Sequence, residues 1–171
     1  MRKTVCVFLM CLVTLCAFEA AAQDDIAISK NRIVSLQYTL FIDGNKVIET
    51  TMGKGSMTYV HGKGQLLEAL EDELEGMRKG QEKNIVINPK DAYGEINKEF
   101  IIKMPLEKLP GGAGVEGEVL SISGEDTTPV KCTVTKIDSK NATLDFNHPL
   151  AGKILRYKVK IIDVKDIRQL G

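Results

Sequence analysis

Cysteine is scarce in this sequence, and most of it lies at one end. Only four of the 171 residues are cysteines, and three of these, Cys6, Cys11 and Cys16, lie close to the N-terminus. If that segment is removed, Cys132 is the only cysteine left and an internal disulfide is impossible. The sequence therefore excludes a small disulfide-stapled scaffold. We expect the fold to be stabilised by the burial of apolar side chains alone.

An excess of charge of either sign is also absent. The chain has 23 basic and 23 acidic residues, and loss of the N-terminal segment barely changes this balance. Neither a basic patch for nucleic acid nor a basic amphipathic helix for a membrane surface is indicated. The sequence thus predicts no nucleic-acid partner, and no membrane partner once the N-terminal segment has been cleaved.

A long hydrophobic run is missing as well. The apolar run at residues 5–18 is short for a membrane span, which needs about 20 residues. It follows a basic start and precedes Ala20, Ala21 and Ala22, a pattern typical of a secretory signal peptide over residues 1–22. We therefore expect an exported protein, periplasmic or secreted. An uncleaved anchor is one alternative, and a lipoprotein processed at Cys16 is another, although Leu15 is bulky for that processing.

Strands are predicted by alternation. Apolar residues at 34, 36, 38 and 40 alternate with polar ones, which is typical of a half-buried strand. Asp43 and Gly44 predict a hairpin turn, with a return strand over residues 46–49. Further strands are expected at residues 57–60, 85–87 and 154–164. The last is long and apolar enough to be central in a sheet.

One helix is predicted, over residues 65–75. Its apolar residues recur at helical spacing, and Gly76 is well placed to end it. The acidic residues between 68 and 75 are interpreted as a solvated face rather than a metal site. The apolar face comprises Leu66, Leu67, Leu70 and Leu74, and the acidic face comprises Glu68, Glu71, Asp72 and Glu75.

The segment from 97 to 145 differs in character from its surroundings. Prolines and glycines punctuate its start, and short strands are expected at residues 118–122, 130–137 and 142–146. The segments DAYG at 91–94 and NHPLAG at 147–152 flank it. This arrangement is typical of one small domain interrupted by another.

Four motifs carry a family resemblance: YVHGKG at 59–64, LEGM at 74–77, DAYG at 91–94 and NHPLAG at 147–152. In this order they resemble the FKBP-type peptidyl-prolyl isomerases of the SlyD-like branch, over residues 33–167. The resemblance implies an α+β fold in which a twisted antiparallel sheet is wrapped around one short helix. It implies an isomerase domain at residues 30–96 and 146–168, and an insert-in-flap domain at 97–145 that binds unfolded chains.

The activity that the resemblance implies needs no cofactor and no metal. The bond before proline has cis and trans forms of similar energy, but the barrier to rotation is about 18–20 kcal/mol. Since no bond is broken, an apolar pocket with a well-placed hydrogen-bond donor is sufficient to favour the twisted transition state. The final residues, 165–171, contain no histidine or cysteine, so a role in nickel or zinc delivery is not indicated.

The resemblance also implies the site. Tyr93 would donate its hydroxyl to the substrate carbonyl, and Glu49 and Tyr38 would complete the catalytic set. Tyr93 lies between Ala92 and Gly94 on a loop, where packing alone gives little reason for a tyrosine. Glu49 stands where many family members have aspartate. The substrate-binding residues would be Ile48, Met57, Leu66, Leu67, Leu70 and Tyr157.

Three functions are compatible with these features. The first is a monomeric isomerase that acts on unfolded, proline-containing polypeptides, with chaperone activity from its insert. The second is a holdase-type chaperone with little or no isomerase activity, because Glu49 stands where aspartate is common and Met57 and Leu70 replace aromatic residues common in drug-binding relatives. The third, which ignores the resemblance, is a structural β-protein of the cell envelope.

Overall fold

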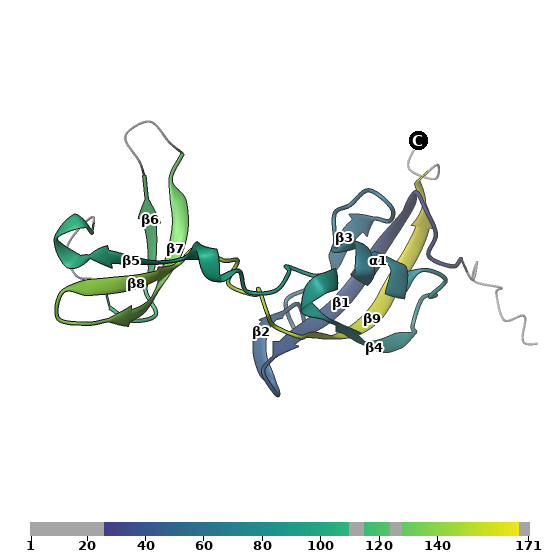
Figure 1. Ribbon diagram of the computed structural model, residues 1–171. Coiled ribbons are helices and arrows are strands. Elements are labelled where there is room, and N and C mark those ends of the chain that lie inside the picture. The colour runs from purple at the N-terminus through teal and green to yellow at the C-terminus, as the bar shows by residue number, and fades with distance from the viewer. Residues whose placement is uncertain (1–25, 110–114, 124–127, 168–171) are drawn as a thin grey trace, which may run out of the picture.

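The computed structural model describes residues 26–109, 115–123 and 128–167. The predicted signal peptide lies outside these residues, so it stays a prediction. Figure 1 shows two lobes joined by a narrow neck. The larger lobe contains a five-stranded sheet and the smaller one a four-stranded sheet. This confirms the predicted fold class, a mostly antiparallel α+β protein with one short helix and a second, smaller β unit.

The larger sheet has the order β2-β1-β9-β4, and β3 pairs with the opposite end of β1 from β2. All of its pairings are antiparallel, and β9 is interior, as its length and hydrophobicity predicted. Between β1 and β2, Asp43 and Gly44 have φ values of 44° and 87°, the left-handed pair that a tight hairpin turn requires. The strands are β1 (Arg32–Ile42), β2 (Lys46–Thr50), β3 (Met57–Val60), β4 (Glu82–Ile87) and β9 (Leu155–Asp166).

The helix α1 spans Glu68–Leu74 and is shorter than predicted. Leu67 has an extended ψ of 136°, so the helix cannot start before it. The side chain of Gln65 is held by the Val60 N–H, which donates to its Oε1 at 2.7 Å. Leu66 and Leu67 therefore come from a loop rather than from the helix.

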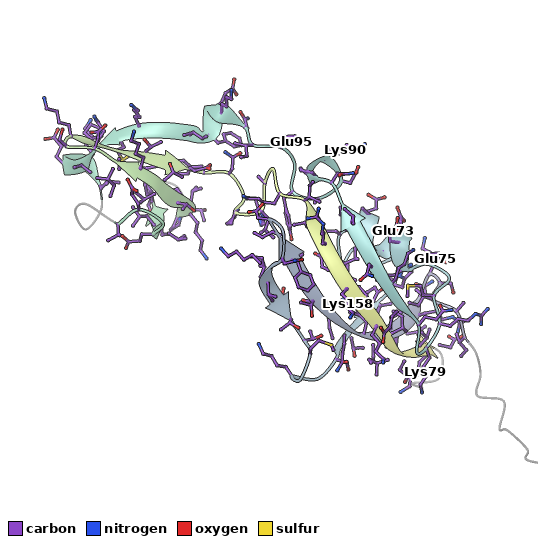
Figure 2. The ribbon with its side chains drawn as sticks, turned by 90° about the horizontal axis from the view of Figure 1, so that it is seen from below. Glu73, Glu75, Lys79, Lys90, Glu95 and Lys158 are labelled. Atoms are coloured by element: carbon purple, nitrogen blue, oxygen red, sulfur yellow. The ribbon has the colours of Figure 1, made fainter. Side chains whose placement is uncertain are left out.

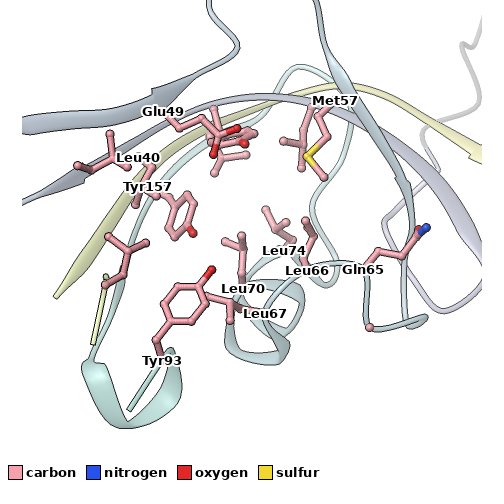
Figure 3. Close-up of a pocket in the computed structure, with 16 residues that line it drawn as sticks. Leu40, Glu49, Met57, Gln65, Leu66, Leu67, Leu70, Leu74, Tyr93 and Tyr157 are labelled. Carbon is pink, nitrogen blue, oxygen red and sulfur yellow. The ribbon is translucent and has the colours of Figure 1, made fainter. Parts of the chain in front are cut away.

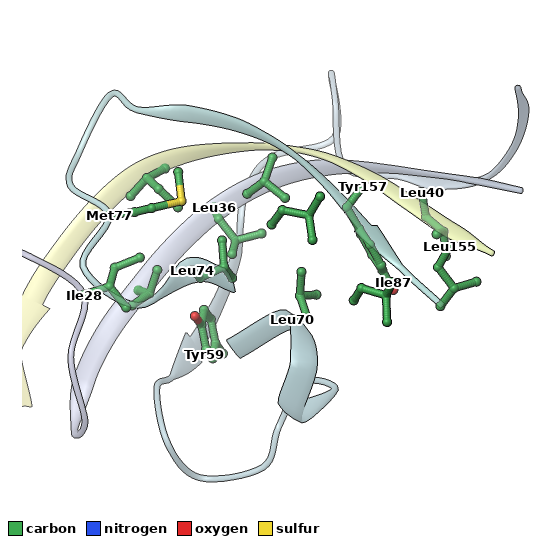
Figure 4. Close-up of a cluster of buried hydrophobic side chains, with 14 of the residues drawn as sticks. Ile28, Leu36, Leu40, Tyr59, Leu70, Leu74, Met77, Ile87, Leu155 and Tyr157 are labelled. Carbon is green, nitrogen blue, oxygen red and sulfur yellow. The ribbon is translucent and has the colours of Figure 1, made fainter. Parts of the chain in front are cut away.

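The core of the larger lobe lies between α1 and the concave face of its sheet (Figure 4). Val34, Leu74 and Ile161 are completely buried there. Ile28 is 1% exposed and its N–H donates to the Met77 carbonyl at 2.7 Å. The polar lead before β1 is thus part of this lobe, which includes residues before 30.

The prediction of a uniformly solvated acidic face on α1 is wrong. Glu71 is only 8% exposed, and its Oε2 accepts a hydrogen bond from the Gly62 N–H at 2.9 Å. Glu75 Oε2 lies 2.7 Å from Nε2 of His61, so a histidine also contacts this face of the helix. The reason is that the loop after β3 returns across this side of the helix, which helical periodicity alone does not reveal.

The smaller sheet has the order β5-β8-β7-β6 and its own core. Three of its strands were predicted to within one residue at each end. The fourth, β5, was missed because Pro105 was interpreted as punctuation, whereas it ends an edge strand, a position that tolerates proline. The strands are β5 (Ile101–Pro105), β6 (Val119–Ile122), β7 (Val130–Ile137) and β8 (Asn141–Asp145), and the buried residues are Leu109, Cys132, Val134, Ala142 and Leu144.

Reciprocal hydrogen bonds join the two chain segments of the neck. The Asn97 N–H donates to Oδ1 of Asn147 at 2.9 Å, and Nδ2 of Asn147 donates to the Asn97 carbonyl at 2.9 Å. One step further, the Phe146 N–H donates to the Phe100 carbonyl at 2.9 Å. The chain therefore leaves the larger lobe and returns to it at the same point.

Three short 3₁₀ helices complete the description: η1 (Pro89–Asp91), η2 (Lys98–Phe100) and η3 (Leu106–Lys108). In the part of the chain that the structure describes, every helix is too short or too polar to cross a bilayer.

Candidate active site

A pocket of about 400 Å³ opens between α1 and the concave face of the larger sheet (Figure 3). It brings together residues that are more than 100 positions apart in the sequence. All nine site residues named from the sequence line it, although their roles stay predictions. They are Tyr38, Ile48, Glu49, Met57, Leu66, Leu67, Leu70, Tyr93 and Tyr157.

The apolar wall of this pocket is larger than the sequence indicated. Leu36 and Leu40 line it beside Tyr38, on the same face of β1, which the alternation of that strand already implied. Leu150 comes from the NHPLAG segment and was not named as a site residue. The pocket thus has an apolar floor and an apolar back wall.

Tyrosine hydroxyls supply most of the polar groups in the pocket. The rings of Tyr38 and Tyr157 lie with centroids 6.0 Å apart. Burial, and then a hydrogen bond to the Glu49 carboxylate, raise the pKa of Tyr38 well above its usual value. Burial, followed by the nearby Tyr93 and Glu49, raises the pKa of Tyr157 to about 12. Both phenols are therefore protonated at neutral pH and able to donate hydrogen bonds.

Tyr93 lies at the rim, on the loop that follows η1. The Gly94 N–H donates to the Pro89 carbonyl at 2.8 Å and closes this loop. The Tyr93 side chain reaches into the pocket, while the residue as a whole is 39% exposed (Figure 3). A rim position suits a group that meets an incoming chain.

His148 supports Tyr93 from behind, a contact that the sequence analysis missed. The two rings are stacked, with centroids 3.8 Å apart and planes within 9° of parallel. Nδ1 of His148 accepts a hydrogen bond from the Leu150 N–H at 3.2 Å, which restrains the ring. The NHPLAG motif contained this histidine, but only the tertiary structure pairs it with Tyr93.

The DAYG and NHPLAG segments are also joined through their backbones. The Gly152 N–H donates to the Gly94 carbonyl at 2.8 Å. Gly152 has a φ of 70°, and a Cβ there would lie 2.9 Å from Cγ1 of Ile96. Only glycine fits this crossing without strain. The segment returning from the smaller lobe is therefore part of the framework that holds Tyr93.

Comparison with protein families identifies the chain. Residues 24–147 match the model of the FKBP-type peptidyl-prolyl cis-trans isomerases. The chain belongs to this family. This FKBP-type protein is also similar to curated relatives of the SlyD branch, at between 24% and 36% identity.

Three of these relatives show how far the similarity extends. The SlyD isomerase of Vibrio cholerae is 32% identical over 138 residues, which cover 81% of this chain and 69% of the relative. That of Aeromonas hydrophila is 36% identical over 134 residues, 78% of this chain and 62% of the relative. That of Treponema pallidum is 31% identical over 141 residues, 81% of this chain and 79% of the relative. The chain thus spans less than two thirds of the Aeromonas protein.

The FKBP-type pocket of this chain has a chemistry suited to rotation rather than to bond cleavage. Its lining is mainly aliphatic, and its polar side chains are three phenols, the Glu49 carboxylate and the Gln65 amide. Across residues 26–109, 115–123 and 128–167, no three histidine, cysteine or acidic side chains are placed to hold a metal ion together. The groups present can orient a carbonyl by hydrogen bonds and surround a proline ring with apolar surface.

Proposed function

We propose that this protein catalyses cis-trans isomerisation of prolyl bonds in exported, unfolded polypeptides, and that its smaller lobe holds those polypeptides. The observation that supports this most directly is the pocket of about 400 Å³, with its apolar floor and its three phenol groups, of which that of Tyr93 lies at the rim. A pocket of that size is within the range of small-ligand sites. It accommodates a proline ring and the neighbouring backbone.

The proposed mechanism uses the difference between a planar and a twisted imide. Twisting removes the resonance of the carbon–nitrogen bond, which is the source of the barrier of about 18–20 kcal/mol. The twisted state is less polar than the planar state, so water stabilises it less well. An apolar floor formed by Leu66, Leu67 and Leu70 reduces this disadvantage of the twisted state. Tyr93, held by His148, donates its hydroxyl to the substrate carbonyl, and this bond counts toward catalysis only as far as it strengthens in the transition state.

A Tyr93→Phe variant tests the enzyme. We expect kcat/KM on a short proline peptide to fall roughly tenfold, because one hydrogen bond is worth about 1 kcal/mol net and more where it acts on the transition state. Magnetisation-exchange NMR on the peptide measures this rate. Tyr59→Phe is the matched control, since that tyrosine is buried away from the pocket against His61. An unmodified protein that leaves the peptide rate unchanged at micromolar concentration would defeat the proposal.

The smaller lobe has an apolar surface that favours chain binding. Ile102 and Val130 lie on the face of the smaller sheet that carries the buried Val134 and Leu144, yet they are 46% and 51% exposed. An apolar sheet face that the lobe leaves partly uncovered favours an interaction surface. The same feature favours the second candidate, a holdase with little catalysis. Aggregation suppression that persists in a Tyr93→Phe, Glu49→Ala variant would favour the holdase, provided that peptide turnover is already negligible in the unmodified protein.

Export is the remaining part of the proposal, and residues 1–22 motivate it. We expect signal peptidase to cleave after Ala22, so that the mature chain begins at Gln23. Intact-mass measurement on the protein recovered from the periplasm or the medium checks this start. Recovery of the full-length chain from the membrane fraction would instead support an uncleaved anchor.

A further inference from the structure

We call the pocket between α1 and the larger sheet the proline pocket. A second hollow, of about 420 Å³, lies beside it. Gly64 lines both hollows, so only the loop after β3 separates them. We call this second hollow the acidic cleft. Four carboxylates and one ammonium group line it, and its residues are Lys30, His61, Gly62, Gly64, Glu68, Glu71, Asp72 and Glu75.

Glu71 is the side chain in this cleft that lacks a complete set of partners. The residue is 8% exposed, and its Oε2 accepts from the Gly62 N–H. Its other oxygen, Oε1, is buried and has no hydrogen-bond partner among the described residues. A buried carboxylate oxygen without a donor is costly, because desolvation is not compensated. A donor supplied from outside would remove this cost once the Glu71 side chain turns Oε1, which is buried in this structure, towards the cleft.

Neighbouring groups do not provide that donor. His61 is 4% exposed, and both of its ring nitrogens are engaged: Nδ1 with the Tyr59 hydroxyl at 3.0 Å, and Nε2 with Glu75 at 2.7 Å. Among the residues that line the cleft, Lys30 supplies one positive charge and four carboxylates supply negative charge. The cleft therefore has net negative charge and an unused acceptor.

The acidic surface continues around the helix toward the other side of the proline pocket. A shallower hollow shares Leu67 with the proline pocket, and shares Glu68 and Asp72 with the acidic cleft. It adds Asp91, whose carboxylate lies 4.0 Å from the Lys90 ammonium. A polypeptide whose proline occupies the proline pocket therefore passes close to carboxylates in two places, namely the acidic cleft and the shallower hollow that contains Asp91.

We propose that the acidic cleft binds an arginine side chain of the client, a few residues away from the proline being isomerised. Guanidinium suits the cleft because it is planar and has five N–H donors, which allows it to bond two carboxylate oxygens at once. A metal ion suits it less, since the described residues place no three ligands together. This inference rests on the proposed function, and it assigns that function a preference for basic, proline-containing chains.

Binding of a peptide series tests the inference. Each peptide has one proline, with arginine placed in turn at the four positions on either side, and its partner has the isosteric, uncharged citrulline at the same position. We expect one placement at which arginine lowers Kd about tenfold relative to citrulline, as for a hydrogen-bonded ion pair at a partly open site. Calorimetry on the mature protein measures both values.

Two variants locate the effect. Glu71→Gln keeps an acceptor for the Gly62 N–H but removes the charge, so the ratio of the two Kd values should fall to nearly one. Because that substitution is buried, a Glu68→Gln, Asp72→Asn double variant at exposed positions provides a second test, with an expected ratio of roughly three. Glu73→Gln is the control: Glu73 is on the same helix, near Glu75 (Figure 2), but pairs with Lys83 at 2.9 Å outside the cleft. Its ratio should stay at about ten.

Equal Kd values for arginine and citrulline peptides at every position would overturn the inference, as would a tenfold preference that survives in both cleft variants. Turnover of a peptide with leucine at these positions is measured in parallel. Because binding and turnover are separate readouts, absence of turnover would count against the proposed function alone, while the Kd ratio still decides the role of the cleft.

Discussion

Replacement of residues 101–145 by an Asn-Gly turn is expected to keep the turnover of a short proline peptide within about threefold of that of the unmodified protein. The same change is expected to lower the rate of prolyl isomerisation in an unfolded protein roughly a hundredfold. The smaller lobe would no longer hold the client close to the pocket. Tethering of this kind raises the effective concentration for the second binding event, and the overall affinity rises by about two to four orders of magnitude. Removal of one of two linked sites loses that gain while the other site is unaffected.

The structure indicates where the cut can be made. The Phe146 N–H donates to the Phe100 carbonyl at 2.9 Å, so the two chain ends are already paired as neighbours in a hairpin. Asn-Gly favours the tight turn that such a pair requires. Asn97 and Asn147 stay in place, and with them the reciprocal hydrogen bonds of the neck.

Two substrates measured side by side check this prediction. Exchange NMR reports on the short peptide, and proline-limited refolding of a reduced, unfolded protein reports on the large client. The control is the full-length Tyr93→Phe variant, which should slow both substrates by the same factor. Equal loss on both substrates in the turn variant would contradict the proposed division of labour.

The second large effect is expected from Leu144→Ala, which removes a completely buried side chain from the core of the smaller lobe. Leucine-to-alanine changes in a core cost about 2–5 kcal/mol. A lobe with few buried residues has little stability to lose, because small domains bury a smaller fraction of their surface. We therefore expect the smaller lobe to unfold while the larger lobe, which has a separate core, stays folded.

Cys132 provides a direct measurement of this local unfolding. Its side chain is 2% exposed, and burial raises the pKa of the thiol. In Leu144→Ala the thiol should react with an aromatic disulfide reagent at least tenfold faster than in the unmodified protein, while short-peptide turnover persists. Leu155→Ala is the matched control, since Leu155 is equally buried in the other core. It should reduce peptide turnover without exposing Cys132, and fast thiol labelling in Leu155→Ala would show that the two cores are not independent. Slow thiol labelling in Leu144→Ala would contradict the expected unfolding of the smaller lobe.

Much of the larger lobe could be predicted because its signals are local. The alternation through Tyr38, the Asp43-Gly44 turn and the long apolar strand β9 depend on neighbours in the sequence, and all three appear in the structure. The helix was predicted at the right place but too long, because leucine spacing does not distinguish a helical turn from a loop whose leucines line the same pocket. Leu66 and Leu67 line the pocket from such a loop.

The site residues were predictable for a different reason, which is that motifs in family order assign positions to roles. Nine positions named in this way converge on one pocket. His148 was contained in one of the motifs but was not assigned a role, because its stacking on Tyr93 joins residues that are 55 positions apart. No periodicity spans such a separation.

Local sequence patterns specify which segments are extended, where the tight turn lies, that a second unit interrupts the first, and which family the chain resembles. These are consequences of side-chain alternation, turn chemistry and motif order, all of which act over a few residues. The three-dimensional packing was needed to establish that Asn97 contacts Asn147, that His148 stacks on Tyr93, and that Glu71 is buried rather than solvated. Each of these depends on which distant segment packs against a given face, and a sequence pattern specifies the face but not its neighbour.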